Sequence, residues 1–224
     1  MDQPNETDQR ANKELKSHPG LTASASREHP RNGLKEALRL HFRAELKAIS
    51  LTERALGSAQ ACLLLKENII WTRSHSILFY DPLPDEVDVW PLLAEALTSG
   101  REVCLPRYVP SEDSYVASRL RNPQSDLSPG KFGIRETGAD CPVVSPNQLD
   151  LVLVPGISFD LNGHRLGRGQ GYYDRLLPTV RGTKCGLAFD RQIATEIPAE
   201  PHDVALDYLV TPTRCLAVSA RTQT

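Results

Sequence analysis

Hydrophobic side chains recur at helical spacing from residue 34 onward, at Leu34, Leu38, Phe42, Leu46 and Ile49. Positions three or four residues apart lie on one face of a helix, so this spacing predicts an amphipathic helix. The stretch Ser50-Leu-Thr-Glu53 then matches a capping box, in which a serine hydroxyl and a glutamate carboxylate each accept a main-chain N–H. A second helix is therefore expected over about residues 51–70.

Short apolar runs alternate with helical stretches farther along the chain. The helix is expected at Trp90–Ser99, because Pro91 suits its first turn and Gly100 follows its end. The apolar runs predict buried strands at Ser76–Tyr80, Glu102–Leu105, Leu151–Val154, Lys184–Phe189 and Tyr208–Val210. Such alternation predicts a three-layer, Rossmann-like α/β fold with a largely parallel sheet flanked by helices, whose sites lie beyond the carboxyl ends of the strands.

Two segments depart from this alternation. Residues 1–33 are polar and almost free of large hydrophobic side chains, so they predict a disordered tail, followed by a single domain over residues 34–224. Residues 121–147 are rich in Pro, Ser, Asn and Gly and predict long loops, with Lys131–Arg135 as a brief strand.

Composition limits the function classes. The 224 residues are 40% hydrophobic and 24% charged with a formal net charge of −2, so an anion site has to be local and no global attraction to nucleic acid is expected. The five cysteines are scattered without a C-x-x-C pair, which argues against a disulfide framework and a structural zinc site. No apolar run approaches the length of a membrane span and no signal peptide is recognisable, so we expect a cytoplasmic protein that contacts no membrane.

The segment after the predicted strand Leu151–Val154 suits a polyphosphate. Its glycines can adopt positive φ and bring main-chain N–H groups close to an anion, and its two arginines offer forks of donors that match phosphate oxygens; these residues are Gly163, Gly167, Gly169 and Gly171, with Arg165 and Arg168. A helix is predicted to begin at Tyr172, which adds the positive end of its dipole. Asp174 then lies one turn into that helix, where it could reach a metal carried by a triphosphate.

Simpler interpretations compete at each of these positions. The loop matches neither the dinucleotide pattern nor the P-loop, and glycines and arginines are common in surface turns. The basic residues Lys35, Arg39, Arg43 and Lys47, spaced four apart, can form a solvated helix face. Asp203 can cap a helix, and Glu86 can stabilise the start of one.

One resemblance sharpens this interpretation. The stretch Val154-Pro-Gly-Ile-Ser-Phe-Asp160, followed by Gly163-His-Arg-Leu-Gly-Arg-Gly-Gln-Gly-Tyr-Tyr-Asp174, resembles the central signature of the 5-formyltetrahydrofolate cyclo-ligases, also called 5,10-methenyltetrahydrofolate synthetases. The resemblance extends from about Lys35 to Thr211. It implies a ligase of folate and one-carbon metabolism that uses ATP and Mg²⁺ to convert 5-formyltetrahydrofolate to 5,10-methenyltetrahydrofolate, with release of ADP and phosphate. In such a reaction ATP phosphorylates the formyl oxygen and N10 closes the ring.

The resemblance also implies roles for individual residues. The catalytic residue is Arg168, near the transferred phosphoryl group, and the metal ligands are Asp174 and Asp203. ATP is expected to bind Lys35, Arg39, Arg165, Leu166, Gly167, Arg168, Gly169, Gln170, Gly171, Tyr172 and Tyr173. The folate is expected to bind Phe79, Tyr80, Glu86, Arg168 and Tyr172. Gln170 departs from members of the family that have lysine there and removes one positive charge from the loop.

Two other functions stay open at this point. A non-catalytic member of the family would bind folate or nucleotide without turnover, although retention of Arg168, Asp174 and Asp203 favours catalysis. An RNA-binding module would use the basic helix and the loop, but the near-neutral net charge and the lack of aromatic residues interleaved with basic ones argue against it. The expected partners are therefore ATP and 5-formyltetrahydrofolate, bound by a monomer.

Overall fold

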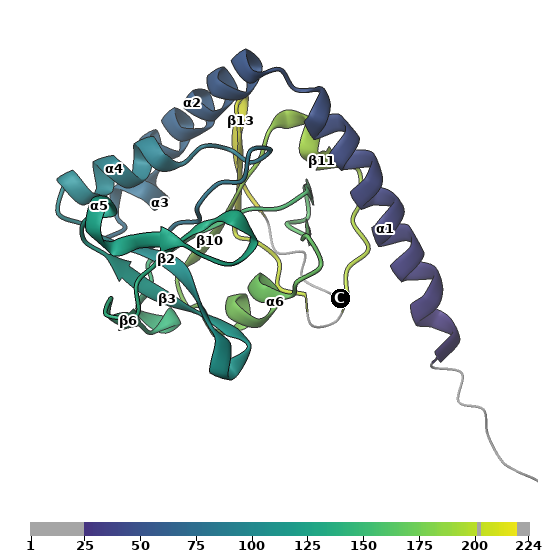
Figure 1. The fold of residues 1–224 in the computed structure, drawn as a ribbon. Coiled ribbons are helices and arrows are strands. Elements are labelled where there is room, and N and C mark those ends of the chain that lie inside the picture. The colour runs from purple at the N-terminus through teal and green to yellow at the C-terminus, as the bar shows by residue number, and fades with distance from the viewer. Residues whose placement is uncertain (1–24, 201–202, 219–224) are drawn as a thin grey trace, which may run out of the picture.

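The computed structural model describes residues 25–200 and 203–218, which form a central sheet with helices packed on it (Figure 1). The helices are α1 (Ala25–Ala48), α2 (Leu51–Glu67), α3 (Ile69–Thr72), α4 (Trp90–Thr98), α5 (Pro123–Asp126) and α6 (Tyr172–Leu176). The main sheet contains β1 (Ser76–Leu78), β2 (Glu102–Val109), β3 (Ser114–Leu120), β6 (Val143–Val144), β7 (Leu151–Val154), β10 (Thr183–Leu187), β12 (Tyr208–Thr211) and β13 (Arg214–Ala217). Two small sheets pair β4 (Leu127–Pro129) with β5 (Arg135–Thr137), and β8 (Ser158–Asp160) with β9 (Arg165–Leu166) and β11 (Ile193–Ala194).

The main sheet has 8 strands in the order β13-β12-β10-β7-β1-β2-β3-β6. Its central strands β12, β10, β7, β1 and β2 run parallel, whereas β13, β3 and β6 pair antiparallel at the two edges. The largely parallel α/β fold predicted from the alternation of elements is thus confirmed. The antiparallel edges were not predicted, since β13 and β3 come from hairpins and β6 returns after a long connection, rather than from strand–helix–strand units.

Hydrophobic layers cover both faces of the sheet. Along β7, Leu151 and Leu153 point into the core beneath α2, α3 and α4, whereas Val152 and Val154 point into a second core that includes Leu176 of α6. Successive strand residues face opposite sides, so an apolar run buried on both faces is what a central parallel strand requires. This explains why a run of only aliphatic residues could be recognised as a strand.

Helix α1 differs from its prediction at its start. It begins at Ala25 rather than near residue 34, so residues 25–33, assigned to the polar tail, are helical. Adding a residue to an existing helix needs no new nucleus, which lets a packed helix extend into polar sequence. Residues 1–24 lie outside the described residues. The packed part of α1 is its C-terminal half, where Phe42 and Leu46 are buried, and Ile49 just after the helix is buried as well.

Two further predictions needed correction. The helix expected over 51–70 is divided at Asn68, whose side chain caps α3 by accepting the main-chain N–H of Ile70. The strand expected at Lys131–Arg135 is wrong: Lys131–Gly133 form a 3₁₀ turn, in which Gly133 has a φ of 78°, and the strand starts only at Arg135. The capping box at Ser50 and Glu53 is confirmed.

The state of the cysteines and the character of the helices match what the sequence predicted. All five cysteines are free, as their scattered spacing predicted. None of the helices in the described part of the chain has the length and apolar character that a membrane span needs.

Gly182, just before β10, packs closely against the turn that precedes β7. A Cβ added to Gly182 would overlap the main-chain oxygens of Leu149 and Asp150, neither of which can move without disturbing β7. We expect Gly182→Ala to destabilise the fold by about 1–3 kcal/mol, the usual cost of overpacking. Gly33→Ala is the matched control, because a Cβ there meets nothing within 4 Å and alanine favours a helix by up to about 1 kcal/mol. Urea unfolding of both variants measures the difference, and equal stability would contradict this account of Gly182.

Candidate active site

The candidate site lies where the order of the parallel strands reverses. From β1 the chain leads to β2 on one side, whereas β7 leads to β10 on the other side. The segments that follow β1 and β7 therefore leave the same edge of the sheet in different directions. A crevice at such a switch point is the usual ligand site of an open α/β sheet.

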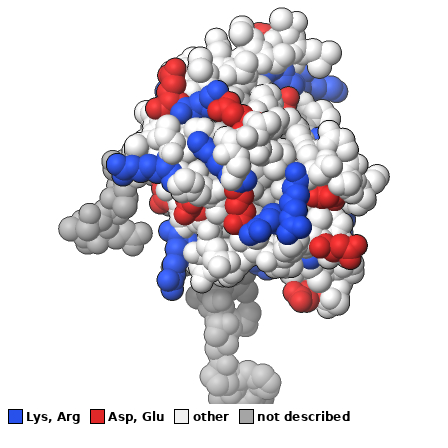
Figure 2. All heavy atoms as spheres, turned by 90° about the vertical axis from the view of Figure 1, so that its left-hand side faces the viewer, with Lys and Arg blue, Asp and Glu red and all other residues white. Residues whose placement is uncertain are grey.

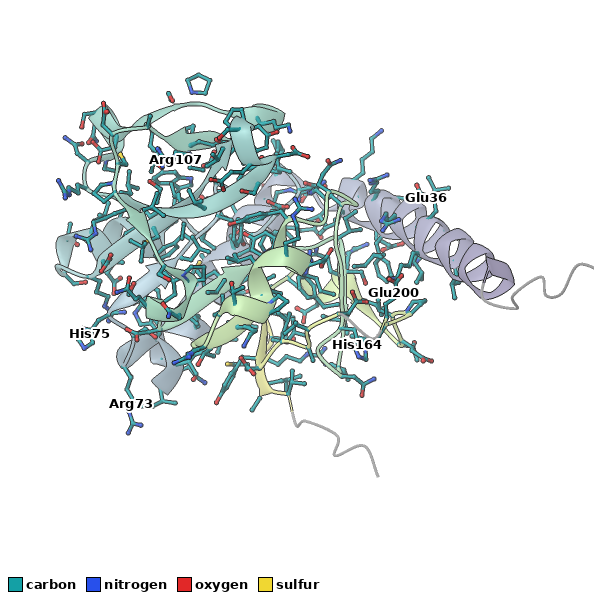
Figure 3. The ribbon with its side chains drawn as sticks, turned by 90° about the horizontal axis from the view of Figure 1, so that it is seen from below. Glu36, Arg73, His75, Arg107, His164 and Glu200 are labelled. Atoms are coloured by element: carbon teal, nitrogen blue, oxygen red, sulfur yellow. The ribbon has the colours of Figure 1, made fainter. Side chains whose placement is uncertain are left out.

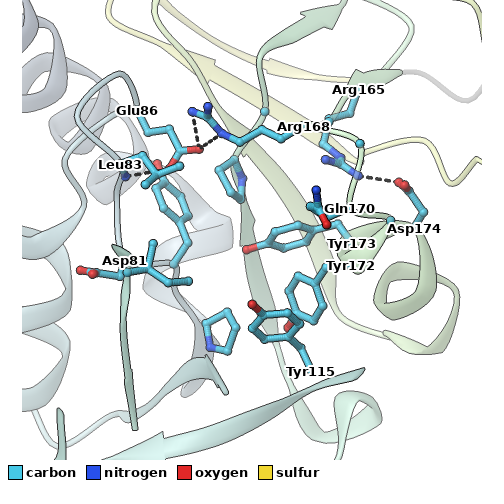
Figure 4. A pocket seen from close by; sticks show the side chains of 18 residues that line it. Asp81, Leu83, Glu86, Tyr115, Arg165, Arg168, Gln170, Tyr172, Tyr173 and Asp174 are labelled. Atoms are coloured by element: carbon cyan, nitrogen blue, oxygen red, sulfur yellow. Dashed lines mark hydrogen bonds and ion pairs between the residues drawn. The ribbon is translucent and has the colours of Figure 1, made fainter. Parts of the chain in front are cut away.

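A pocket of about 300 Å³ occupies this crevice (Figure 4). The segment after β1 contributes Tyr80, Asp81, Leu83 and Glu86, and β2 and β3 contribute Pro106 and Tyr115. The other wall is the long segment after β7, which supplies Pro155, Gly156, Arg165 and every residue from Gly167 to Asp174. Most of the predicted glycine–arginine loop thus lines one cavity.

A buried carboxylate organises the first part of this loop. Asp160 is fully buried at the end of β8, and its side chain accepts the main-chain N–H groups of Asn162, His164 and Ile197 at 2.9–3.0 Å and contacts His164 Nδ1 at 2.9 Å. These bonds close the turn between β8 and β9. They also attach the turn to the segment that follows β11.

The glycines of the loop behave largely as predicted. Gly163, Gly169 and Gly171 have φ values of 84°, 96° and 65°, a region that other residues rarely adopt. Gly167 is not in that region, but a Cβ there would collide with the guanidinium of Arg165. Helix α6 starts directly after Gly171, so its first N–H groups lie beside the loop.

Arg168 crosses from the loop to the segment after β1. Its Nε donates to Glu86 Oε1 at 3.1 Å (Figure 4), and its Nη2 contacts Asp85 Oδ1 at 2.5 Å. The Glu86 carboxylate is also fixed by the main-chain N–H of Leu83, which donates to Oε2 at 3.0 Å. The helix start considered for Glu86 is wrong, because this residue lies in a turn well before α4.

The Glu86 carboxyl group is buried beside this arginine. Burial raises the pKa of Glu86, and the nearby Arg168 guanidinium and the hydrogen bond from Leu83 offset only part of that rise. Buried carboxyl groups with a raised pKa beside a specific charged partner are frequent in functional sites.

Aromatic rings form the apolar wall of the pocket. The ring centroids of Tyr115 and Tyr172 lie 4.5 Å apart and those of Tyr172 and Tyr173 lie 4.7 Å apart (Figure 4). Burial raises the pKa values of Tyr172 and Tyr173, so both phenols stay protonated. Within the described part of the chain their buried hydroxyl groups find no hydrogen-bond partner, which leaves two donors for a ligand.

Helix α1 contacts the loop from outside the pocket. Arg39 Nε donates to the carbonyl of Gly167 at 3.1 Å, and Lys35 Nζ lies 2.8 Å from Glu200 Oε1 and 3.6 Å from Asp203 Oδ2. Figure 3, which views the molecule from below, shows Glu36 of α1 and Glu200 on the same side of the molecule. The N-terminal helix therefore brings two basic side chains to the loop and to the segment that carries Asp203.

Comparisons with known proteins identify the family of this fold and site. A family described as the 5-formyltetrahydrofolate cyclo-ligase family matches residues 31–212. The chain belongs to the 5-formyltetrahydrofolate cyclo-ligase family. It is 31% identical over 196 residues to the mouse 5-formyltetrahydrofolate cyclo-ligase, which covers 79% of this chain and 92% of the mouse protein. The solved 5,10-methenyltetrahydrofolate synthetase of Aquifex aeolicus has 34% identity and a TM-score of 0.76, covering 85% of this chain and 96% of that one.

Membership of this cyclo-ligase family confirms the resemblance found in the signature and makes the protein a ligase by family. The 5-formyltetrahydrofolate cyclo-ligase of Escherichia coli K12 is similar as well, with 32% identity over 145 residues that cover 63% of this chain and 80% of that protein.

Most of the residues expected to bind ATP or folate line the pocket. These are Tyr80, Glu86, Arg165, Gly167, Arg168, Gly169, Gln170, Gly171, Tyr172 and Tyr173. Two others do not. Phe79 lies fully buried in the core with its ring 6.2 Å from that of Trp71, and Leu166 is buried in a cluster with Phe42 and Ile157. Alternation along the extended chain explains both, because their neighbours Tyr80 and Arg165 take the pocket side.

The two aspartates expected to hold the metal lie beside different cations. Asp174 contacts Arg165 Nη2 at 2.5 Å, and Asp203 lies near Lys35. Asp203 caps no helix in the described residues; its carboxylate accepts the main-chain N–H of Glu200. Where the chain is described, no three His, Cys, Asp or Glu side chains form a metal cluster.

Sequence reasoning missed Tyr115 and Asp85. Tyr115 belongs to β3, a strand that was not predicted, so nothing pointed from it toward the loop. Asp85 precedes Glu86 in a Pro-rich turn and was not singled out from the sequence. Its adjacency to Glu86 was the one signal that could have found it.

The buried Glu86 carboxyl group predicts a pH dependence of stability. Its pKa in the folded protein lies above the ordinary value of 4.5, so its contribution to stability is fully present below about that pH and is lost as pH rises through the raised pKa. We expect the unfolding free energy of the wild type to fall relative to Glu86→Gln over this window. Urea unfolding of both proteins from acid to neutral pH tests it, and a difference that does not change with pH would be the contrary result.

Proposed function

We propose that the protein converts 5-formyltetrahydrofolate to 5,10-methenyltetrahydrofolate with ATP and Mg²⁺, releasing ADP and phosphate. The observation that carries this proposal is Arg168, which reaches from a phosphate-suited glycine loop to the buried Glu86 across a pocket of the cyclo-ligase family. The pocket thereby joins a cationic end to an end that suits a flat, hydrogen-bonding ring.

The folate end of the pocket is supported by its chemistry. The rings of Tyr115 and Tyr172 offer stacking surfaces, and the unpartnered hydroxyls of Tyr172 and Tyr173 offer donors. Glu86 offers a buried carboxylate that can accept N–H groups of a pterin. Such a mixture of apolar walls and a few directed polar groups is typical of small-molecule sites.

The proposed reaction proceeds in two steps. The formyl oxygen attacks the γ-phosphorus of ATP, and the bond from that phosphorus to the bridging oxygen breaks to release ADP. The N10 lone pair then attacks the formyl carbon, the carbon–oxygen bond breaks as phosphate departs, and N10 loses its proton. The protein's task is to position the groups and to stabilise charge on the phosphoryl oxygens.

The cations around the loop suit that task. Arg168 would contact the transferred phosphoryl group, and Arg165 and the N–H groups at the start of α6 would contact other phosphate oxygens. Lys35 and Arg39 would approach from α1. Small displacements of Arg165, Lys35 and Arg39 from their carboxylate partners would bring these side chains to a bound nucleotide.

The donor set also fits Mg²⁺. This ion prefers oxygen ligands and binds proteins through one or two carboxylates together with substrate phosphates, and Asp174 presents a half-exposed carboxylate at the rim of the pocket. Asp174 and Asp203 would hold the ion, which when bound neutralises charge on the phosphates.

An RNA-binding role receives less support. On the face shown in Figure 2, Lys and Arg side chains are interspersed with Asp and Glu. Nucleic-acid surfaces gather positive charge on one face instead.

Purified protein with ATP, Mg²⁺ and 5-formyltetrahydrofolate is expected to form the methenyl product, followed by its absorbance, with one phosphate released per product. The same mixture without ATP is the control. A folded protein that binds 5-formyltetrahydrofolate yet forms neither product would support the non-catalytic alternative, in which the pocket only binds.

Arg168→Ala is expected to lower kcat by about a hundredfold, because removing one preorganised donor to a transition state typically costs on the order of 3 kcal/mol. Arg168→Lys should restore little, since an ammonium cannot reproduce a two-pronged contact. Arg121→Ala, at an exposed position outside the pocket, is the matched control. Steady-state kinetics with a melting curve decides the matter, and a kcat near that of the wild type would remove Arg168 from the catalytic machinery.

A further inference from the structure

The local backbone around Arg168 does not determine the direction of its side chain. It lies between Gly167 and Gly169, and Gly169 has a φ of 96° with nothing within 4 Å of a Cβ added there. A long side chain on such a backbone has many rotamers, so its direction has to come from contacts with other segments.

Two consecutive carboxylates supply those contacts. Glu86 Oε1 accepts Nε of Arg168 at 3.1 Å and also lies 3.1 Å from Nη2, whereas Asp85 Oδ1 lies closer to Nη2, at 2.5 Å. Consecutive residues can face the same guanidinium because the chain turns here, with Glu86 N donating to the Leu83 carbonyl at 2.9 Å. Within the described residues, Nη1 of Arg168 makes no hydrogen bond, so this edge of the guanidinium group remains available to a ligand.

The two carboxylates differ in what else they hold. Glu86 is buried, with Oε2 engaged by Leu83 and Oε1 by Arg168, so a folate N–H that binds Glu86 has to share an oxygen with one of these donors. Asp85 is half-buried, and Arg168 is the partner of its carboxylate among the described residues. Asp85 can therefore keep its hold on Arg168 when Glu86 turns to the substrate.

We propose that Asp85 is a positioning residue that holds Nη2 of Arg168, so that the open Nη1 edge points to the transferred phosphoryl group while Glu86 binds folate. The inference rests on the proposed function and adds a residue to it. Asp85 itself touches neither substrate. Its effect on the reaction passes entirely through the direction of the guanidinium.

The test compares Asp85→Asn, which keeps the shape of the side chain and removes its charge, with Asp140→Asn, the same change at an exposed aspartate outside the pocket. We expect Asp85→Asn to lower kcat by about tenfold, the size of one lost charge-assisted hydrogen bond that orients a catalytic group. The KM for 5-formyltetrahydrofolate should change by less than about twofold, because Glu86 still binds it. Asp140→Asn should match the wild type, and melting curves confirm that each variant is folded.

A double-mutant cycle separates positioning from general damage. In the Arg168→Ala background, Asp85→Asn should cause no further loss of kcat, because the side chain through which it acts is gone. Asp85→Glu should recover part of the loss by restoring the charge. If the two substitutions lowered kcat independently, so that their effects multiplied in the double variant, the proposal would be overturned. An unchanged kcat, or a higher kcat with tighter ATP binding, would also overturn it, since these would mean that Asp85 restrains Arg168 instead.

One readout does not need catalysis. The Arg168 Nη2–H signals in a nitrogen-15 NMR spectrum, assigned by their loss in Arg168→Ala, should exchange with water about tenfold faster in Asp85→Asn if Asp85 anchors the guanidinium. Unchanged exchange would refute the anchor even in an active enzyme. Absence of methenyl product from the wild type would instead refute the proposed function, while the exchange measurement still judges the contact.

Discussion

The parallel pairing of β1 with β7 is the constraint on which the site depends. Ile77 and Leu78 pair with Leu151 and Val152, and every one of these residues is fully buried, so the register between the strands leaves no freedom to slip. Because the chain departs from this pair in opposite directions, the segments that follow it stand apart at the sheet edge. The crevice is therefore a property of topology, and the side chains only decide what it binds.

Charge pairing gives the site its second level of order. Each prominent cation lies against a carboxylate: Arg168 against Asp85 and Glu86, Arg165 against Asp174, and Lys35 against Glu200 and Asp203. Partly buried charges need such partners, and the partners fix long side chains that would otherwise sample many rotamers. A polyphosphate entering the crevice would compete with these carboxylates for Arg165 and Lys35, whereas Arg168 would keep its contact with Asp85.

Features that depend on neighbouring residues along the chain could be predicted from the sequence, whereas contacts between distant residues could not. The strand Leu151–Val154 was predicted with its observed bounds because an aliphatic run between turns has few other uses, and the glycines of the loop carried their own conformational signal. Phe79 and Tyr80 could not be told apart, since only the strand's facing decides which one enters the pocket. The contact from Arg168 to Glu86 joins residues 82 positions apart, and no local pattern encodes it.

The buried Asp160 has a consequence for how the loop can change in evolution and in motion. Its bonds to Asn162, His164 and Ile197 bind the turn to a second segment, so the stretch up to Arg165 belongs to the rigid frame. Beyond it, Gly169 and Gln170 stand clear of the core. Adaptation to a different ligand is therefore expected to be concentrated at Gln170, where side-chain length and charge can vary at little cost to folding, whereas the positive φ of Gly169 favours glycine there.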